Sequence, residues 1–216
     1  MNYFESIFDI LYLVSVISIS ILIIRKGIKS NNKATILFGV MGFLLGFGDS
    51  FHLIPRIIGH LTTGLDDYQT ALGIGKLITG TTMTIFYYLI YRYYVLVTGK
   101  NNKTVHLTII TLIVIRFLLL SLPGNDWINN GNSLLYGVIR NVPFAIIGGI
   151  IVTLFLNAKE KDVNKQFYNM GLWIIVSFVC YIIVVIGSGF IPLLGAFMMP
   201  KTVAYFIIVY LGYKNN

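Results

Sequence analysis

Long apolar runs separated by short polar stretches divide the whole chain. A helix needs about 20 mostly apolar residues to cross the roughly 30 Å hydrocarbon layer of a bilayer. Seven runs meet that requirement, so the pattern predicts an all-α fold, a bundle of seven transmembrane helices in one domain covering residues 1–216. The predicted spans cover approximately residues 7–24, 34–58, 70–97, 104–122, 133–156, 167–186 and 192–213.

The composition supports a membrane protein. Hydrophobic residues make up 56% of the 216 positions and charged residues only 11%, whereas soluble domains carry about 25% charged residues. No polar stretch is long enough to fold as a separate soluble domain. The single cysteine, Cys180, excludes a disulfide within the chain.

The connections between the runs alternate in charge. Four basic clusters follow the first, third, fifth and seventh runs: Arg25, Lys26, Lys29 and Lys33; Arg92, Lys100 and Lys103; Lys159, Lys161 and Lys165; and Lys214. The other connections hold Asp66, Asp67 and Asp126, and the first residues include Glu5 and Asp9. Lys and Arg accumulate on the cytoplasmic side of membrane proteins. The bias predicts a multi-pass cell-membrane protein with its N-terminus outside and its C-terminus inside. It also explains the net charge of +8 without nucleic acid as a partner.

Aromatic residues support one border of the third run. Its cytoplasmic end contains Tyr87, Tyr88, Tyr91, Tyr93 and Tyr94. Tyrosine is enriched where the hydrocarbon meets the lipid headgroups. We therefore expect these rings at the headgroup level.

Five basic residues do not fit this topological pattern, because they lie inside the predicted spans. They are Arg56, Lys76, Arg116, Arg140 and Lys201. All fall in the outer half of their spans or near the midplane, and one embedded acidic residue, Asp49, accompanies them. A charge at the bilayer centre costs roughly 2.5–3.5 kcal/mol on the mildest scale, so such residues are usually paired or functional.

The second run shows the sharpest polar pattern. Asp49, His52, Arg56 and His60 are spaced by three, four and four residues, which places them on one face of a helix. We expect this face to point into the bundle. Pro55 lies within it and is expected to bend the helix or interrupt its hydrogen bonding.

The embedded charges predict an outward-facing cationic cavity that binds a small anionic ligand, such as a phosphate, a carboxylate or a lipid headgroup. Arginine stays charged when buried and suits bidentate contact with oxyanions. We expect Arg116 and Arg140 to be decisive. The predicted ligand-binding residues are Arg56, Lys76, Arg116, Arg140, Asn141 and Lys201.

One hypothesis adds chemistry to that binding, namely a lipid-active hydrolase within the membrane. Asp49 and His52 are then the candidate catalytic acid and base. Ceramidase-like and adiponectin-receptor-like hydrolases carry a closing HxxxH motif on their last helix, and the last run here has no histidine. The Gly48-Asp49 pair is similar to a glycine–aspartate pair of lysoplasmalogenase-like proteins, but the similarity covers only these residues and assigns no family.

Other functions remain open. The cavity could belong to a receptor or a transporter without catalysis, or the charges could form a purely structural network. We expect no metal, because so many cations would repel a divalent ion, and no cofactor. A retinal protein is disfavoured because Lys201 directly follows Pro200, and because the third run carries Lys76 where a carboxylate counter-ion is needed.

Overall fold

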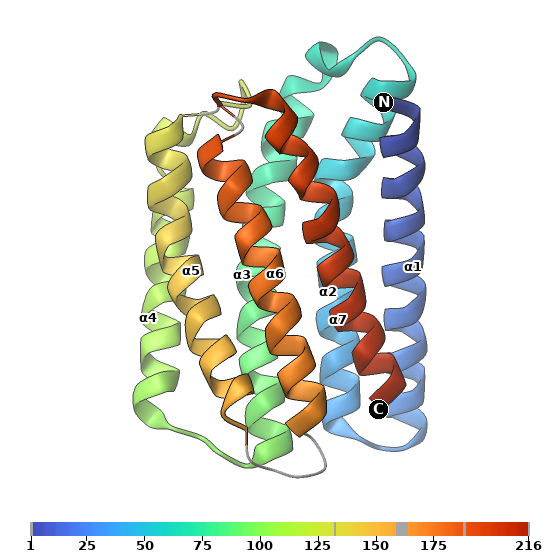
Figure 1. Ribbon diagram of the computed structural model, residues 1–216, viewed down its shortest axis with the longest axis vertical. Coiled ribbons are helices and arrows are strands. Elements are labelled where there is room, and N and C mark those ends of the chain that lie inside the picture. Colours follow the sequence, from blue (N-terminus) through green and yellow to red (C-terminus); the bar gives the residue numbers. More distant parts are fainter. Residues whose placement is uncertain (1, 132, 159–163, 188, 216) are drawn as a thin grey trace.

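The computed structural model describes residues 2–131, 133–158, 164–187 and 189–215, and these ranges form an all-helical bundle without a strand. The predicted basic residues Lys159 and Lys161 lie outside the described residues. The seven α-helices are α1 (Asn2–Lys29), α2 (Lys33–Leu61), α3 (Gln69–Thr98), α4 (Lys103–Leu120), α5 (Leu134–Leu156), α6 (Asn164–Gly187) and α7 (Met198–Asn215). The two chain termini lie at opposite ends (Figure 1). We call these the N-terminal end and the C-terminal end of the bundle.

Three short 3₁₀ helices lie in the connections at the N-terminal end: η1 (Leu65–Tyr68), η2 (Pro123–Asn125) and η3 (Pro192–Phe197). The last one corrects the predicted start of the seventh helix. The prediction began that helix at residue 192, but α7 begins at Met198. The reason is local, since η3 starts with a proline and contains Gly195, which has a low helix propensity. Pro55 and Pro143 lie inside the unbroken helices α2 and α5.

Six of the helices, all except α3, are long and apolar enough to cross a membrane. The prediction of a seventh span is not matched by the composition of α3, although that helix is 30 residues long. Its position explains the difference. It packs against α2, α4 and α5, and residues along much of its length are buried. A helix shielded by its neighbours can carry threonines and tyrosines that a lipid-facing helix could not.

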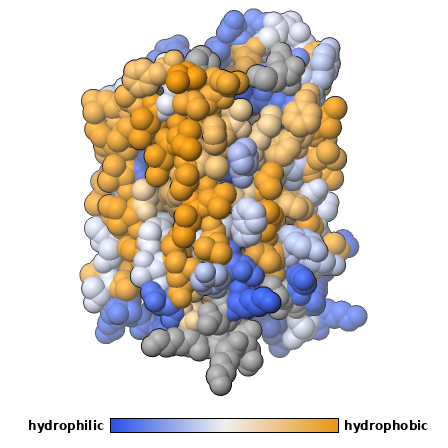
Figure 2. Space-filling view, in the orientation of Figure 1, coloured by the Kyte–Doolittle hydropathy of each residue, from blue (hydrophilic) through white to orange (hydrophobic). Residues whose placement is uncertain are grey.

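Large apolar side chains cover much of the outer surface. Leu107, Leu118 and Leu135, for example, are each more than 60% exposed. Figure 2 shows hydrophobic residues over the middle and upper part of one face, with hydrophilic residues gathered at its C-terminal end. Soluble monomers rarely expose such continuous apolar surface, so the surface agrees with a protein that lies in lipid.

Aromatic rings fill the core of the C-terminal half. Phe155 and Phe167 pack with ring centroids 4.7 Å apart, and Phe167 also packs edge-on against Tyr94. The expectation that the tyrosines of α3 lie at the headgroup level stays a prediction, but four of the five do not lie on the surface of the bundle. Tyr87, Tyr91, Tyr93 and Tyr94 are buried in this core, and only Tyr88 is partly exposed. Because α3 lies inside the bundle, these four rings point at other helices.

Candidate functional site: a cationic cavity

A cavity of about 620 Å³ occupies the N-terminal half of the bundle. Its wall includes all six residues predicted to bind a ligand, and His52 as well: His52, Arg56, Lys76, Arg116, Arg140, Asn141 and Lys201. These residues come from five helices, α2, α3, α4, α5 and α7. The structure therefore brings together side chains up to 149 positions apart in the sequence.

Two glycines position the α2 and α3 walls of the cavity. A Cβ atom at Gly75 would overlap the carbonyl oxygen of Phe51, and one at Gly48 would overlap the side chain of Thr82. Nearby, the Thr79 hydroxyl donates a hydrogen bond to the Gly48 carbonyl at 3.1 Å. The absent side chains let the two helix backbones approach closely. This close approach brings together the segments of α2 and α3 that carry His52 and Lys76.

Arg116 is the most deeply buried of the cavity cations, with 3% of its surface exposed. Its Nη1 donates to the Arg140 carbonyl at 3.1 Å and to Asn141 Oδ1 at 3.2 Å. Its guanidinium carbon lies 4.1 Å from the centre of the Phe144 ring. The Nε atom is buried and has no hydrogen-bond partner among the described residues. Arg116 is thus held by neutral groups and keeps one donor unused.

Arg140 is held by the α4–α5 connection. Its Nη1 donates to Asn125 Oδ1 at 2.8 Å, and its guanidinium carbon lies 4.6 Å from the Trp127 ring centre. The connection is itself anchored, because Asn125 Nδ2 donates to the Leu119 carbonyl at 2.8 Å. Neither Asn125 nor Trp127 was predicted from the sequence as a site residue. Nothing in their local sequence indicates which span they approach.

Lys201 lies over two tyrosine rings. Its Nζ is 4.7 Å from the ring centre of Tyr181 and 5.7 Å from that of Tyr205. The Tyr181 hydroxyl donates to Asn141 Oδ1 at 3.0 Å, the oxygen that also accepts from Arg116. Tyr181 therefore connects the α7 lysine to the α4 arginine, and it is a third site residue that was not predicted from the sequence.

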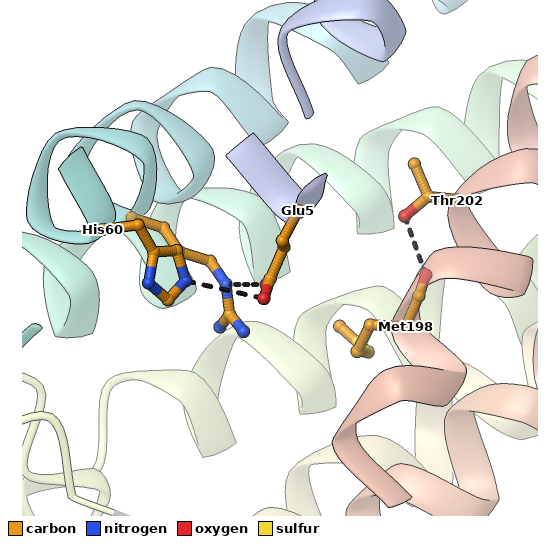
Figure 3. Close-up of polar contacts among 5 residues, drawn as sticks. Glu5, His60, Met198 and Thr202 are labelled. Atoms are coloured by element: carbon orange, nitrogen blue, oxygen red, sulfur yellow. Dashed lines mark hydrogen bonds and ion pairs between the residues drawn. The ribbon is translucent and has the colours of Figure 1, made fainter. Parts of the chain in front are cut away.

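Glu5 of α1 partners the last part of the predicted α2 stripe. Its carboxylate forms an ion pair with Arg56, and its Oε2 lies 3.5 Å from His60 Nε2 (Figure 3). The charge of Arg56 is compensated in this way. His60 itself does not line the cavity.

The two predicted catalytic residues point to different neighbours. Asp49 accepts a hydrogen bond from the Tyr12 hydroxyl at 2.7 Å and is not among the residues that line the cavity. His52 lines it, and its Nδ1 lies 3.2 Å from the Leu72 carbonyl. Since a carbonyl only accepts, Nδ1 carries a proton in this contact, and Nε2 is an acceptor when the imidazole is neutral. The shared face of α2 is divided because its two edges meet α1 and α3, and a catalytic role for the pair stays a prediction.

Positive charge dominates the cavity. Five Lys or Arg residues and no Asp or Glu occur among the described residues that line it. Neither Arg116 nor Arg140 forms a salt bridge with a described carboxylate. Comparisons with protein-family models, with curated proteins and with solved structures found no match to this chain.

Proposed function

We propose that this chain is a multi-pass cell-membrane protein whose cationic cavity opens to the outside and binds an anionic ligand through an oxyanion group. The observation that carries the proposal is Arg116. It is almost fully buried, it has no carboxylate partner among the described residues, and its Nε donor is unused. A buried unpartnered donor costs about 1–3 kcal/mol, and more when it is charged. A phosphate or carboxylate in the cavity would compensate the charge of this guanidinium.

The surroundings of Arg116 favour the same ligand. Arg140 and Lys201 also line the cavity. Arg140 contacts an amide oxygen and an aromatic ring, Lys201 lies over aromatic rings, and neither forms a salt bridge with a described carboxylate. A purely structural network would balance its charges, because unbalanced buried charge is costly. The excess charge is explained if an external anion completes the balance. No contact supports the hydrolase hypothesis in a comparable way.

Binding is tested with purified protein in neutral detergent. The probes are inorganic phosphate, oleate and oleoyl lysophosphatidate, titrated at constant ionic strength while thermal unfolding is followed. We expect at least one probe to stabilise the wild type, by about 2.7 kcal/mol at a hundredfold excess over its dissociation constant. Arg116→Gln and Arg140→Gln should lose this stabilisation. Arg92→Gln is the matched control, because Arg92 is exposed on α3 near the C-terminal end, and it should keep the full response.

Two results would contradict the proposal. One is that no probe stabilises the wild type. The other is that Arg116→Gln and Arg140→Gln lose intrinsic stability but keep the wild-type probe response, since the charges would then be only structural. If Arg116→Gln does not fold, Arg140→Gln still decides, because Arg140 is only partly buried.

The orientation is tested separately. The basic residues at the C-terminal end support a cytoplasmic location for that end by the positive-inside rule, and the cavity would then open to the outside. In a Cys180→Ala background, we expect a membrane-impermeant maleimide added to intact cells to label Thr62→Cys but not Lys100→Cys. Both positions are exposed in helix connections at opposite ends of the bundle. Labelling of Lys100→Cys alone would show the opposite orientation and contradict the proposal.

A further inference from the structure

An apolar crevice borders the cationic cavity where α5 and α6 meet. It has a volume of about 120 Å³. Val142, Ile182 and Ile186 are among its lining residues and are 50%, 47% and 53% exposed. These side chains belong to the outer surface of the bundle, where hydrophobic residues cover the helices in Figure 2. The crevice therefore faces the space that lipid chains would occupy.

The crevice and the cavity share part of their walls. Five residues line both: Asn141, Phe144, Tyr181, Val185 and Ile186. Three of the five belong to the contacts described above. Asn141 accepts a hydrogen bond from Arg116, Phe144 lies under its guanidinium, and Tyr181 lies under the Lys201 ammonium. Thus the side chains that hold the cations also form the boundary with the apolar crevice.

The packing of α5 and α6 confines the crevice to the N-terminal half. Further toward the C-terminal end, Gly148 leaves room for the Phe178 ring, which a Cβ atom would overlap. That contact closes the space between the helices. Toward the N-terminal end, a Cβ atom at Gly137, which lines the cavity, would meet nothing within 4 Å. The crevice is thus a lateral feature at the depth of the cavity.

We infer that the ligand is a single-chain anionic lipid, whose oxyanion headgroup lies at Arg116 and Lys201 and whose acyl chain leaves between α5 and α6. This inference rests on the proposed function. A soluble anion would need no apolar path in the side wall. A lipid that enters sideways keeps its chain in an apolar environment, whereas exposing each CH₂ group to water would cost about 0.8 kcal/mol. The crevice is small, about 120 Å³, so it has room for a single acyl chain and not for two side by side.

The experiment compares a lipid with its parts. The probes are oleoyl lysophosphatidate, glycerol 3-phosphate as the headgroup alone, and monooleoylglycerol as the chain with a neutral headgroup. Binding to detergent-purified protein is measured by native mass spectrometry over a concentration series. In the wild type, we expect oleoyl lysophosphatidate to bind at least about tenfold more tightly than either part, a difference of about 1.4 kcal/mol.

A matched pair of variants on α5 tests the path of the chain. Val142→Trp fills the crevice, and Ile139→Trp adds the same ring to an exposed position that lines neither space. We expect Val142→Trp to weaken binding of oleoyl lysophosphatidate at least about tenfold and to leave glycerol 3-phosphate within about twofold of the wild type. Ile139→Trp should change neither. If Val142→Trp does not fold, Ile182→Trp fills the same crevice from α6.

The outcomes separate the two proposals. Equal effects of Val142→Trp and Ile139→Trp on lipid binding would overturn the path between α5 and α6. Equal affinity for glycerol 3-phosphate and the lipid would overturn the inference and leave the anion-binding function standing. Equal affinity for monooleoylglycerol and the lipid, or no binding of any probe, would remove the proposed function, and the inference with it.

Discussion

The two halves of the bundle are built from the same helices but are filled in different ways. In the C-terminal half, α3, α5 and α6 contribute the rings of Tyr94, Phe155 and Phe167, which contact one another with little space left between them. In the N-terminal half, the same three helices separate around a cavity of about 620 Å³ lined by charged side chains. The C-terminal half is a close-packed core, and the N-terminal half encloses a cavity.

This difference separates, along the helices, the packing that stabilises the bundle from the proposed anion site. Tight aromatic packing supplies stability at one end and fixes the helices relative to one another. The other end can then tolerate buried, unbalanced cations such as Arg116, which cost stability. The comparison implies that stability and anion binding respond to mutations at opposite ends of the bundle.

The largest expected effect is the loss of stability when a side chain of the close-packed C-terminal half is truncated. Phe155 is fully buried, so Phe155→Ala should lower the free energy of unfolding by about 3–5 kcal/mol. Met198→Ala, in the cavity wall, should lower it by less than about 1 kcal/mol, because Met198 is only partly buried and borders the cavity. Thermal unfolding of the detergent-purified variants measures both values. Similar losses for the two variants would mean that the halves do not differ in the way described here.

A smaller effect is expected from the ion pair at the cavity rim. Glu5→Gln removes the carboxylate that partners Arg56 and His60. Since this pair is partly exposed to solvent, its loss should lower the free energy of unfolding by less than about 1 kcal/mol. The released charge of Arg56 should increase the affinity for oleoyl lysophosphatidate. A weaker affinity, measured in the same binding assay, would show that Arg56 acts on the ligand only while it is paired.

The half of the bundle that holds the cations could be predicted from sequence, because it depends only on the depth of each residue along its helix. Counting residues from the ends of each apolar run puts Lys76, Arg116, Arg140 and Lys201 in one half of the bundle, and the cavity wall contains all of them. Helix number follows from the same runs. Such predictions need only the rise of a helix per residue.

The contacts around those cations could not be predicted, because they depend on how helices rotate and which connections fold over them. Asn125 and Tyr181 reach the site from 15 and 40 positions away from their hydrogen-bond partners in the chain. Asp49 turns toward α1 rather than into the cavity, because a helix face is broad enough to meet two neighbours. The burial of the α3 tyrosines could not be predicted either, because hydrophobic periodicity does not show which helix the others enclose.

The central claim is that uncompensated positive charge in the cavity binds an anion. Met198 lines the cavity in the first turn of α7, so Met198→Glu and Met198→Gln place a charged and a neutral group of equal shape among the cations. The direct measurement is the dissociation constant of oleoyl lysophosphatidate for the two variants. We predict that the dissociation constant is at least about tenfold higher for Met198→Glu than for Met198→Gln, because the added carboxylate compensates the positive charge that attracts the ligand. Equal dissociation constants for the two variants would contradict the account.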